Sequence, residues 1–548
     1  MSQSAFADLA NRYFEASFRR SPTWATALGR HDLDDRLEDY SLAAAAEEAD
    51  ELRAFHAQFS VETEGLSPAE AADRTWLLAS IDGRLQELEV FRPLETDPDR
   101  YSSGLTHAAF SLINRDFAPA TVRLKALLAR MRAMPAVLEL ARVQLKNPPA
   151  VATEIALDQL AGNRSFFTDT VAAAFDEVEN PDLLRALRHS CAVLDDALAR
   201  YGQFLEDDLL PRSTGEFAIG ATEYARKLRA DELIDVPLEK LLAIGEADLA
   251  ANQAAMEAAC REIDPDATTA EVLARLGATH VAKEELLETT QAMLGEIVTF
   301  LEDRALVTLP PGPPLRVVET PPFMRATTTA AMDTPGPFEE AGTDAYYYMT
   351  LPNPAWLPEE QEAYMQQWSR SLIANLSVHE AYPGHYIQFL LTAKFPTATR
   401  RILWSPSNAE GWAHYCEQMM VEEGFRADDP WYRIAQLQDA LLRNVRVVVG
   451  IGLHTGRMTV DEAIATFERE ARLSAQGAKA EAWRGTMDPT YGYYTLGKLM
   501  LAKLRRDVEA AQGASFSLKA FHDDFLALGP IPLPLVRQAM LGAVGDAL

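Results

Sequence analysis

Residues 379–385 read His379-Glu380-Ala381-Tyr382-Pro383-Gly384-His385. In the helical motif H-E-x-x-H, two histidines on one face bind zinc and the glutamate beside them acts as a general base. Here two extra residues separate the histidines. On a regular helix a six-residue step leaves two side chains about 120° apart, so both rings could not face one ion. We therefore expect Pro383 and Gly384 to lie off the helix path, since proline breaks the hydrogen-bond ladder and glycine tolerates unusual backbone angles.

The alternative for this run is a helix that stops at Pro-Gly and carries two incidental histidines. The next motif, E-G-W-A-H-Y-C-E at residues 410–417, favours a metal site instead. Its Glu410, His414 and Glu417 are spaced i, i+4 and i+7, so they share one face of a helix. Two acids and a histidine would be unusual in a hydrophobic core. They are suited to supply a third metal ligand and the residues that hydrogen-bond to the ligands.

The pair of motifs resembles the large bacterial domain-of-unknown-function family numbered 885. Weaker similarities follow in order along the whole chain, at residues 21–32, 134–138, 147–149, 452–454 and 494–498. That family is regarded as related to the zinc metallopeptidases of the glutamate-ligand type, alongside angiotensin-converting enzyme and thimet oligopeptidase. His414 stands where the family pattern has leucine, so two roles stay open for it: contact with the metal, or with the metal's surroundings.

The composition is that of a soluble globular protein and excludes two classes of partner. Of 548 residues, 48% are hydrophobic and 24% are charged, and the net charge is −30. Such a chain lacks the basic surplus with which proteins bind nucleic acids and anionic membranes. The N-terminus shows no signal-peptide pattern, and no apolar run approaches the roughly 18 residues of a membrane span. Because Cys191, Cys260 and Cys416 form no disulfide framework, we expect a cytoplasmic protein that binds neither nucleic acid nor membrane.

The pattern along the chain predicts a mainly α protein in three parts. Residues 1–305 form a helical N-terminal region and residues 359–548 a helical zinc-binding catalytic region, because both show apolar residues at three- and four-residue steps. Residues 306–358 form a Pro-rich segment with two strand-like pieces, 315–318 and 346–351. The resemblance implies a large two-lobed helical body with a deep channel. It also implies that the small β element before the catalytic helices lines the substrate site, with 346–351 as the pairing strand; an inter-domain linker is the alternative.

The predicted metal site follows the chemistry of catalytic zinc, which takes three protein ligands and keeps a fourth position for water. We assign His379, His385 and Glu410 as ligands of one Zn²⁺. Glu380 is assigned as the general base that takes a proton from the water, because it follows a ligand directly. Glu417 is assigned to orient a ligand histidine through that ring's second N–H, with a plain surface carboxylate as the alternative.

Five more residues are candidates for stabilising the oxyanion or holding the substrate. Tyr494 is the first choice as oxyanion donor by register with the family, and Tyr491 the second; aromatic packing is the alternative for both. His454, which lies among glycines, is another candidate donor. Arg446 and Lys498 are candidate anchors for a substrate carboxylate, with structural salt bridges as the alternative.

These assignments predict a zinc metallopeptidase that cleaves amide bonds of short peptides. A zinc hydrolase of a non-peptide amide would use the same residues, so the sequence does not separate the two. A helical binding protein that keeps the motif without hydrolysis is the third reading; the intact Glu380 speaks against it. The oligomeric state and the natural substrate are not predicted.

Overall fold

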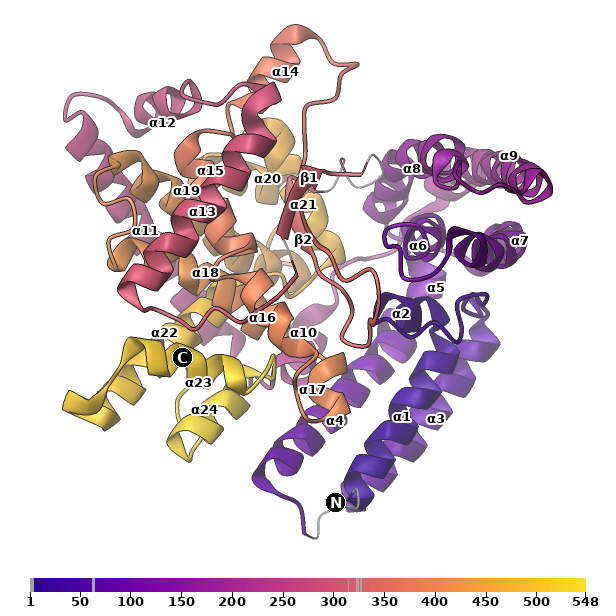
Figure 1. Ribbon diagram of the computed structural model, residues 1–548, viewed down its shortest axis with the longest axis horizontal. Coiled ribbons are helices and arrows are strands. Elements are labelled where there is room, and N and C mark those ends of the chain that lie inside the picture. Colours follow the sequence, from indigo (N-terminus) through magenta and orange to yellow (C-terminus); the bar gives the residue numbers. More distant parts are fainter. Residues whose placement is uncertain (1–3, 62–64, 314, 322–324, 326–327) are drawn as a thin grey trace.

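The fold is mainly α, as the sequence predicts, with one small three-stranded sheet (Figure 1). The computed structural model describes residues 4–61, 65–313, 315–321, 325 and 328–548. The helices before the sheet are α1 (Ala5–Arg20), α2 (Pro22–Ala27), α3 (Leu42–Val61), α4 (Pro68–Gln86), α5 (Pro93–Thr96), α6 (Asp99–Phe110), α7 (Ala120–Gln144), α8 (Ala150–Ser165), α9 (Pro181–Phe204), α10 (Gly220–Glu232), α11 (Leu238–Ile263), α12 (Thr269–Gly277) and α13 (Leu286–Arg304). Those after it are α14 (Pro358–Met365), α15 (Arg370–Glu380), α16 (His385–Thr392), α17 (Ala398–Ile402), α18 (Pro406–Glu422), α19 (Pro430–His454), α20 (Val460–Glu470), α21 (Ala475–Met487), α22 (Tyr493–Gln512), α23 (Leu518–Ala527) and α24 (Leu533–Leu541).

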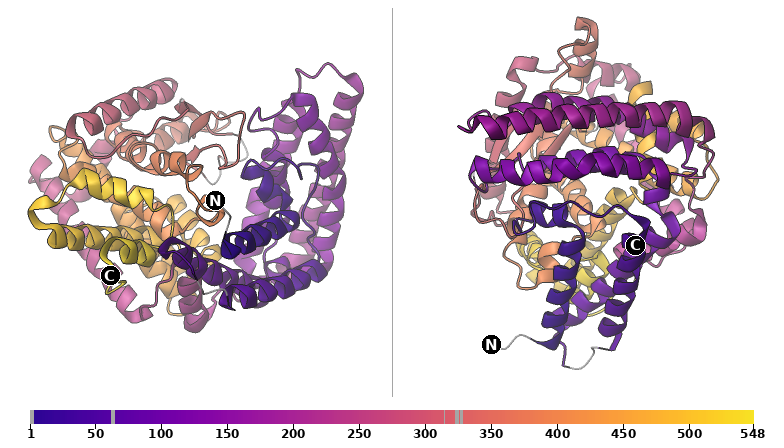
Figure 2. Two further views of the ribbon diagram at one scale, coloured as in Figure 1. Left: turned by 60° about the horizontal axis from the view of Figure 1, so that its bottom comes forward. Right: turned by 90° about the vertical axis from the view of Figure 1, so that its right-hand side faces the viewer.

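Two lobes make up the molecule, with helices α6–α9 standing apart from a larger lobe (Figure 2). The apolar stripe of α9, which includes Leu187, Leu194 and Leu198, is buried in the core of the smaller lobe. Helices α1, α3 and α4 enclose a separate core around Phe14 and Phe59. The larger lobe contains the later helices, and α11 packs along α19 while α13 packs against α15. Residues before 305 thus contribute to both lobes, and the three-part division stays a prediction.

The sheet contains three strands, of which two coincide with the predicted strand-like pieces. They are β1 (Leu315–Glu319), β2 (Ala330–Asp333) and β3 (Ala345–Met349), in the order β1-β3-β2. β3 pairs with β1 in parallel and with β2 antiparallel. The expectation that residues 346–351 pair with substrate is therefore wrong, because both edges of β3 are already occupied. Within the described residues, β1 and β2 each have a strand partner on one edge, so the outer edge of each is free of one.

Close backbone contact fixes the position of α18 against α22. A methyl group on Gly411 of α18 would lie 2.5 Å from the Gly497 carbonyl carbon, and one on Gly497 would lie 2.0 Å from the Ser407 oxygen. No side chain fits between the two helices at this crossing. This contact sets the distance between Glu410, on α18, and Tyr494, on α22.

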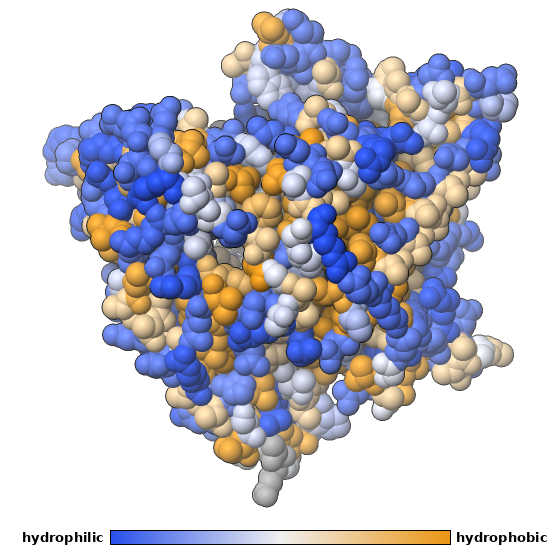
Figure 3. Space-filling view, turned by 180° about the vertical axis from the view of Figure 1, so that it is seen from behind, coloured by the Kyte–Doolittle hydropathy of each residue, from blue (hydrophilic) through white to orange (hydrophobic). Residues whose placement is uncertain are grey.

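Hydrophobic side chains on the face opposite to that of Figure 1 gather towards its middle, and hydrophilic ones cover most of its rim (Figure 3). Exposed large apolar residues are scattered over several elements and include Val61, Leu357 and Trp404. In the part of the chain that the structure describes, no helix has the length and apolar character needed to cross a membrane.

Candidate metal centre

The two histidines of the first motif lie at the facing ends of two helices. α15 begins after Ser369, whose side chain caps it, and ends at Glu380; α16 begins at His385. The inserted residues, including Pro383 and Gly384, lie outside both helices, as the spacing predicts. The turn is held by backbone bonds from Gly384 N to the Val378 oxygen and from Tyr382 N to the Ser377 oxygen, at 3.1 and 3.2 Å. The chain thus leaves the helix path between the two histidines.

Gly384 is required by close approach to the helix that precedes it. A Cβ at this position would lie 1.8 Å from the His379 carbonyl oxygen and 2.6 Å from that of Val378. Real Cβ atoms do not come this close to backbone, so a larger residue would push α16, and with it His385, away from α15.

Gly384→Ala is expected to destabilise the protein and to weaken metal binding, because the methyl group clashes with backbone that cannot move independently. Core substitutions of this kind typically cost about 1–3 kcal/mol. Gly162→Ala in α8 is the matched control, since nothing lies within 4 Å of its added methyl. There alanine should be neutral or stabilise by about 0.5–1 kcal/mol. Thermal unfolding with and without added zinc measures both effects; equal behaviour of the two variants would contradict the contact.

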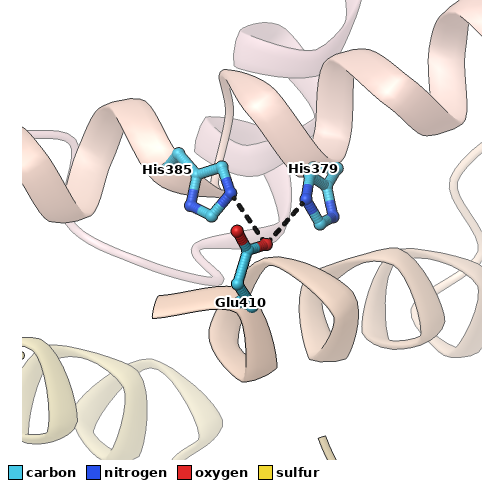
Figure 4. Close-up of side chains that lie close together, drawn as sticks. All are labelled: His379, His385 and Glu410. Atoms are coloured by element: carbon cyan, nitrogen blue, oxygen red, sulfur yellow. Dashed lines mark ion pairs between the residues drawn. The ribbon is translucent and has the colours of Figure 1, made fainter. Parts of the chain in front are cut away.

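Side chains of His379, His385 and Glu410 converge on one point (Figure 4). Glu410 comes from α18, which begins with Ser405 as N-cap and Pro406 in its first turn. Its Oε2 atom lies 3.3 Å from the Nε2 atoms of both histidines, and the three ligand atoms all lie within 4.8 Å of one another. The two imidazole planes meet at 85°, and the Nε2 atom of each ring faces the same Glu410 oxygen.

The donor set fits a divalent metal such as zinc. Ligand atoms about 2.0–2.1 Å from a tetrahedral Zn²⁺ lie about 3.3–3.4 Å apart, which matches both histidine-to-carboxylate distances. Glu410 Oε2 is buried and, among the described residues, has no hydrogen-bond donor. Burial alone would raise the pKa of Glu410, but the His385 and His379 imidazoles hold that pKa well below its usual range. A buried ionised oxygen that faces two imidazole nitrogens is what a cation site requires.

Glu417 fixes the orientation of the first histidine. Its Oε1 lies 2.7 Å from His379 Nδ1, while its Oε2 accepts from Asn375 Nδ2 at 3.2 Å and Arg443 Nη1 at 3.1 Å. Burial alone would raise the pKa of Glu417, but Arg443 and His414 hold it well below its usual range, so the carboxylate is ionised. An ionised partner at Nδ1 places the ring proton there and leaves Nε2 free to bind metal.

Glu417→Gln is expected to lower the affinity for zinc by about 10- to 100-fold, because an amide holds the His379 tautomer more weakly than a carboxylate does. The overall fold should persist, since the amide keeps the size of the side chain. Competition with a fluorescent zinc chelator measures the affinity. An unchanged affinity would mean that His379 needs no orientation from Glu417.

Glu380 lies between the histidines and the sheet. One of its oxygens, Oε2, accepts a hydrogen bond of 3.1 Å from Met332 N on β2. Burial raises the pKa of the Glu380 carboxyl. The carboxylate therefore adjoins the ligand cluster, lies outside it, and contacts β2, whose outer edge has no strand partner among the described residues.

Comparison with known proteins places nearly the whole length of the chain in one family. The profile of a bacterial protein family of unknown function, DUF885, matches residues 22–540. The chain belongs to this family. The match spans both lobes and includes every candidate site residue.

Two solved structures share the fold of this DUF885 protein. One is a candidate lipoprotein of unknown function from Shewanella oneidensis, with 25% identity and a TM-score of 0.82 over 98% of this chain and all of that chain. The other is a candidate lipoprotein from Colwellia psychrerythraea, with 19% identity and a TM-score of 0.83 over 98% of each chain. No curated protein matches the chain.

Tyr494 of the DUF885 chain lies beside the cluster. Its ring is nearly parallel to that of His379, with the ring centres 6.4 Å apart. Its hydroxyl accepts a hydrogen bond of 3.2 Å from Arg484 Nη2. Burial and the neighbouring Glu410 raise the pKa of Tyr494, so its hydroxyl stays protonated near pH 7.

Three other predicted residues lie where they serve packing or ion pairs. Arg446 forms two contacts of 2.8 Å with Glu481, and Lys498 forms one of 2.8 Å with Asp248. The Tyr491 hydroxyl is buried against Gly485 and has no partner among the described residues. The surroundings of Arg446 and Lys498 thus match the alternative of a structural salt bridge, and those of Tyr491 match the alternative of aromatic packing.

Neither of the remaining histidines joins the metal cluster. His414 is fully buried, with Nδ1 3.4 Å from Glu417 Oε2, and burial lowers its pKa to about 4. It therefore belongs to the surroundings of the centre. His454 ends α19, and its Nε2 lies 2.7 Å from the Gly485 oxygen, in a contact with the rings of Phe217 and Tyr224.

Sequence reasoning missed Arg443 and Arg484. Arg443 lies 26 residues after Glu417, the carboxylate it contacts, and Arg484 lies 10 residues before Tyr494. Neither stands in a motif with its partner, and both come from helices that only the tertiary fold brings to the centre.

Proposed function

We propose that this DUF885 protein is a zinc-dependent hydrolase that cleaves amide bonds of short peptides. One observation carries the proposal: two histidines and a glutamate converge with a carboxylate, Glu380, directly beside the ligand His379. A site that only stored metal or only stabilised the fold would have no use for that carboxylate. The ionised Glu417 behind His379 completes the arrangement typical of catalytic zinc.

The chain's own residues would divide the work as follows. Zinc, when bound by His379, His385 and Glu410, would activate a water and polarise an amide carbonyl. Glu380 would take the proton of that water and pass it to the leaving amine. Its Oε2 is held by Met332 N, which leaves Oε1 to receive the proton.

Tyr494 would stabilise the negative charge that develops on the carbonyl oxygen. A guanidinium carries donors and no acceptor, so the Tyr494 oxygen accepts from Arg484 and its own proton is available to another group. The 6.4 Å between the Tyr494 and His379 ring centres supports this role, because it puts the phenol next to a proposed ligand.

Tyr494→Phe is therefore expected to lower kcat by about 10²–10³-fold and to change KM little, because the hydrogen bond is made to the oxyanion and not to the bound substrate. Tyr493→Phe is the matched control, since its hydroxyl donates to Asp488 at 3.1 Å. Steady-state kinetics on one peptide compare the two. A kcat loss that is larger for Tyr493→Phe would move the role away from Tyr494.

Peptides are proposed as the substrate class on two grounds. The resemblance to glutamate-type zinc peptidases favours them, and the available edge of β2 next to Glu380 offers backbone groups to an extended chain. A deep channel, which the resemblance implies, would admit short unfolded peptides and exclude folded proteins. Digestion of a peptide library and of a folded protein of similar composition tests both points; a non-peptide amide hydrolase would cleave neither.

Cytoplasmic residence stays a proposal as well. It is supported by the three cysteines, which are free and buried. The relatives from Shewanella and Colwellia are described as candidate lipoproteins, which favours a membrane-anchored location. Cell fractionation with an antibody to the native protein decides between the two.

A further inference from the structure

Arg484, on α21, lies next to Tyr494 and, among the described residues, has no carboxylate in hydrogen-bonding range. Within the described residues, its one hydrogen bond is the donation of 3.2 Å to the Tyr494 hydroxyl. Its ion-pair partner Asp488 lies 3.9 Å away and already accepts a hydrogen bond from Tyr493. The Arg484 side chain is 39% exposed, so a solute can reach it.

Two other arginines flank the Tyr494 ring, and both are engaged. The Arg446 guanidinium lies 4.8 Å from the ring centre and is held by two contacts to Glu481. The Arg443 guanidinium lies 5.7 Å from it and donates to Glu417. Arg484 lies 5.7 Å from the same ring. Of these three arginines, Arg484 is the one that has no carboxylate within hydrogen-bonding distance among the described residues.

The contacts of Tyr494 limit how far Arg484 lies from the proposed metal ligands. Tyr494 links it to His379: one hydrogen bond of 3.2 Å joins Arg484 to the Tyr494 hydroxyl, and the centres of the Tyr494 and His379 rings lie 6.4 Å apart. One residue of an extended peptide spans at most about 3.6 Å. These separations together correspond to a few extended residues, so an anionic group on Arg484 would belong to a residue within a few positions of a bond that is cleaved at the centre.

We propose that Arg484 binds a carboxylate of the substrate and so determines specificity for it. This rests on the proposed hydrolase function. The planar guanidinium offers parallel N–H groups that match a carboxylate, and these bonds are strengthened by charge. The C-terminal carboxylate is the first source to test, because every short peptide with an unblocked end carries one; an acidic side chain is the second.

Binding is measured on the Glu380→Gln variant, which should hold peptide without cleaving it. Two peptides are used that differ only in a free or an amidated C-terminus. The free acid should bind about 10- to 100-fold more tightly by isothermal titration calorimetry, the range expected for hydrogen bonds to a charged group. Adding Arg484→Gln should remove the difference in affinity between the two peptides. Arg484→Lys in its place should keep part of the difference, because lysine has the charge but not the two parallel N–H donors of a guanidinium.

Lys479→Gln is the matched control, because Lys479 is an exposed cation on the same helix whose ammonium packs 4.0 Å from the centre of the Trp483 ring. It should leave the preference for the free acid intact. A third peptide, amidated and with glutamate as its last residue, separates the two sources. Tight, Arg484-dependent binding of this third peptide would assign the site to a side-chain carboxylate.

Kinetics distinguish binding of a carboxylate from support of Tyr494. With the active enzyme, Arg484→Gln should lower kcat/KM for the free acid about 10-fold or more beyond any loss for the amide, mainly through KM. A loss that is equal for both peptides would show that Arg484 acts through Tyr494, and would overturn the proposal.

Two further outcomes separate this proposal from the proposed reaction. Equal affinity of acid and amide, or a preference that survives Arg484→Gln in a folded variant, overturns the carboxylate site. If the preference depends on Arg484 but the wild-type protein hydrolyses none of the peptides, the carboxylate site stands and the hydrolase function fails.

Discussion

Glu380→Gln is expected to keep zinc at the level of the wild-type protein and to lower kcat by about 10²–10⁴-fold, the usual contribution of a general base. The amide keeps the size of the side chain and can still accept from Met332 N, so the turn and the sheet edge stay in place. It cannot take a proton from water. Zinc content and peptide hydrolysis are measured on the same preparation, with Glu359→Gln on the exposed α14 as the control.

Activity of Glu380→Gln close to that of the wild type, with zinc retained, would remove Glu380 from the mechanism. Loss of zinc along with activity would instead show that Glu380 supports the ligands. The two measurements together therefore separate a base from a ligand, which activity alone does not.

His385→Ala is expected to lose both zinc and hydrolysis. Removal of one of three ligands opens the site and leaves Glu410 with one imidazole. His385 is chosen over His379 because its Nδ1 atom has no hydrogen-bond partner among the described residues, so its replacement disturbs fewer protein contacts. Zinc per chain should fall from about one to near zero, and peptide hydrolysis should fall to the rate measured in buffer without enzyme.

His189→Ala, at an exposed position of α9, is the control for a general effect of histidine removal. It should retain zinc, activity and the unfolding temperature. Retention of stoichiometric zinc by His385→Ala would show that the ion is held elsewhere, and the assignment of the ligands would be wrong.

The local part of the site could be predicted from the sequence because its signals are short-range. The six-residue spacing of His379 and His385, with Pro-Gly between them, requires a break in the helix, and the i, i+7 spacing of Glu410 and Glu417 puts both on one face. Each inference needs helix geometry alone. The mainly α class follows in the same way from apolar periodicity over long segments.

The strand β2 was not predictable from its own residues. Its sequence, Ala-Ala-Met-Asp, has no β-branched or aromatic residue and contains good helix formers. It is a strand because β3 offers an edge to it, which is a tertiary effect. For the same reason the sequence did not show that the predicted strand 346–351 coincides with the central strand and cannot pair with substrate. The position of a strand within a sheet is set by topology and not by composition.

Long-range partners explain the remaining differences. Arg446 and Lys498 carry the charge that a carboxylate anchor needs. In the fold, however, they form ion pairs with Glu481 and Asp248, which come from other helices. Arg484 has no acidic partner at hydrogen-bond distance among the described residues and emerges as the better candidate only once these pairs are visible. His454 has suitable chemistry, but α19 carries it to a contact with Gly485 instead of to the cluster.

Anomalous diffraction at the zinc absorption edge tests the central claim most directly, with crystals of protein purified without chelator and supplied with one equivalent of zinc. The account predicts one strong anomalous peak per chain, about 2.0–2.2 Å from the Nε2 atoms of His379 and His385 and from a Glu410 oxygen. Absence of a peak between these three side chains, or a full-occupancy peak at another place in the chain, would contradict it.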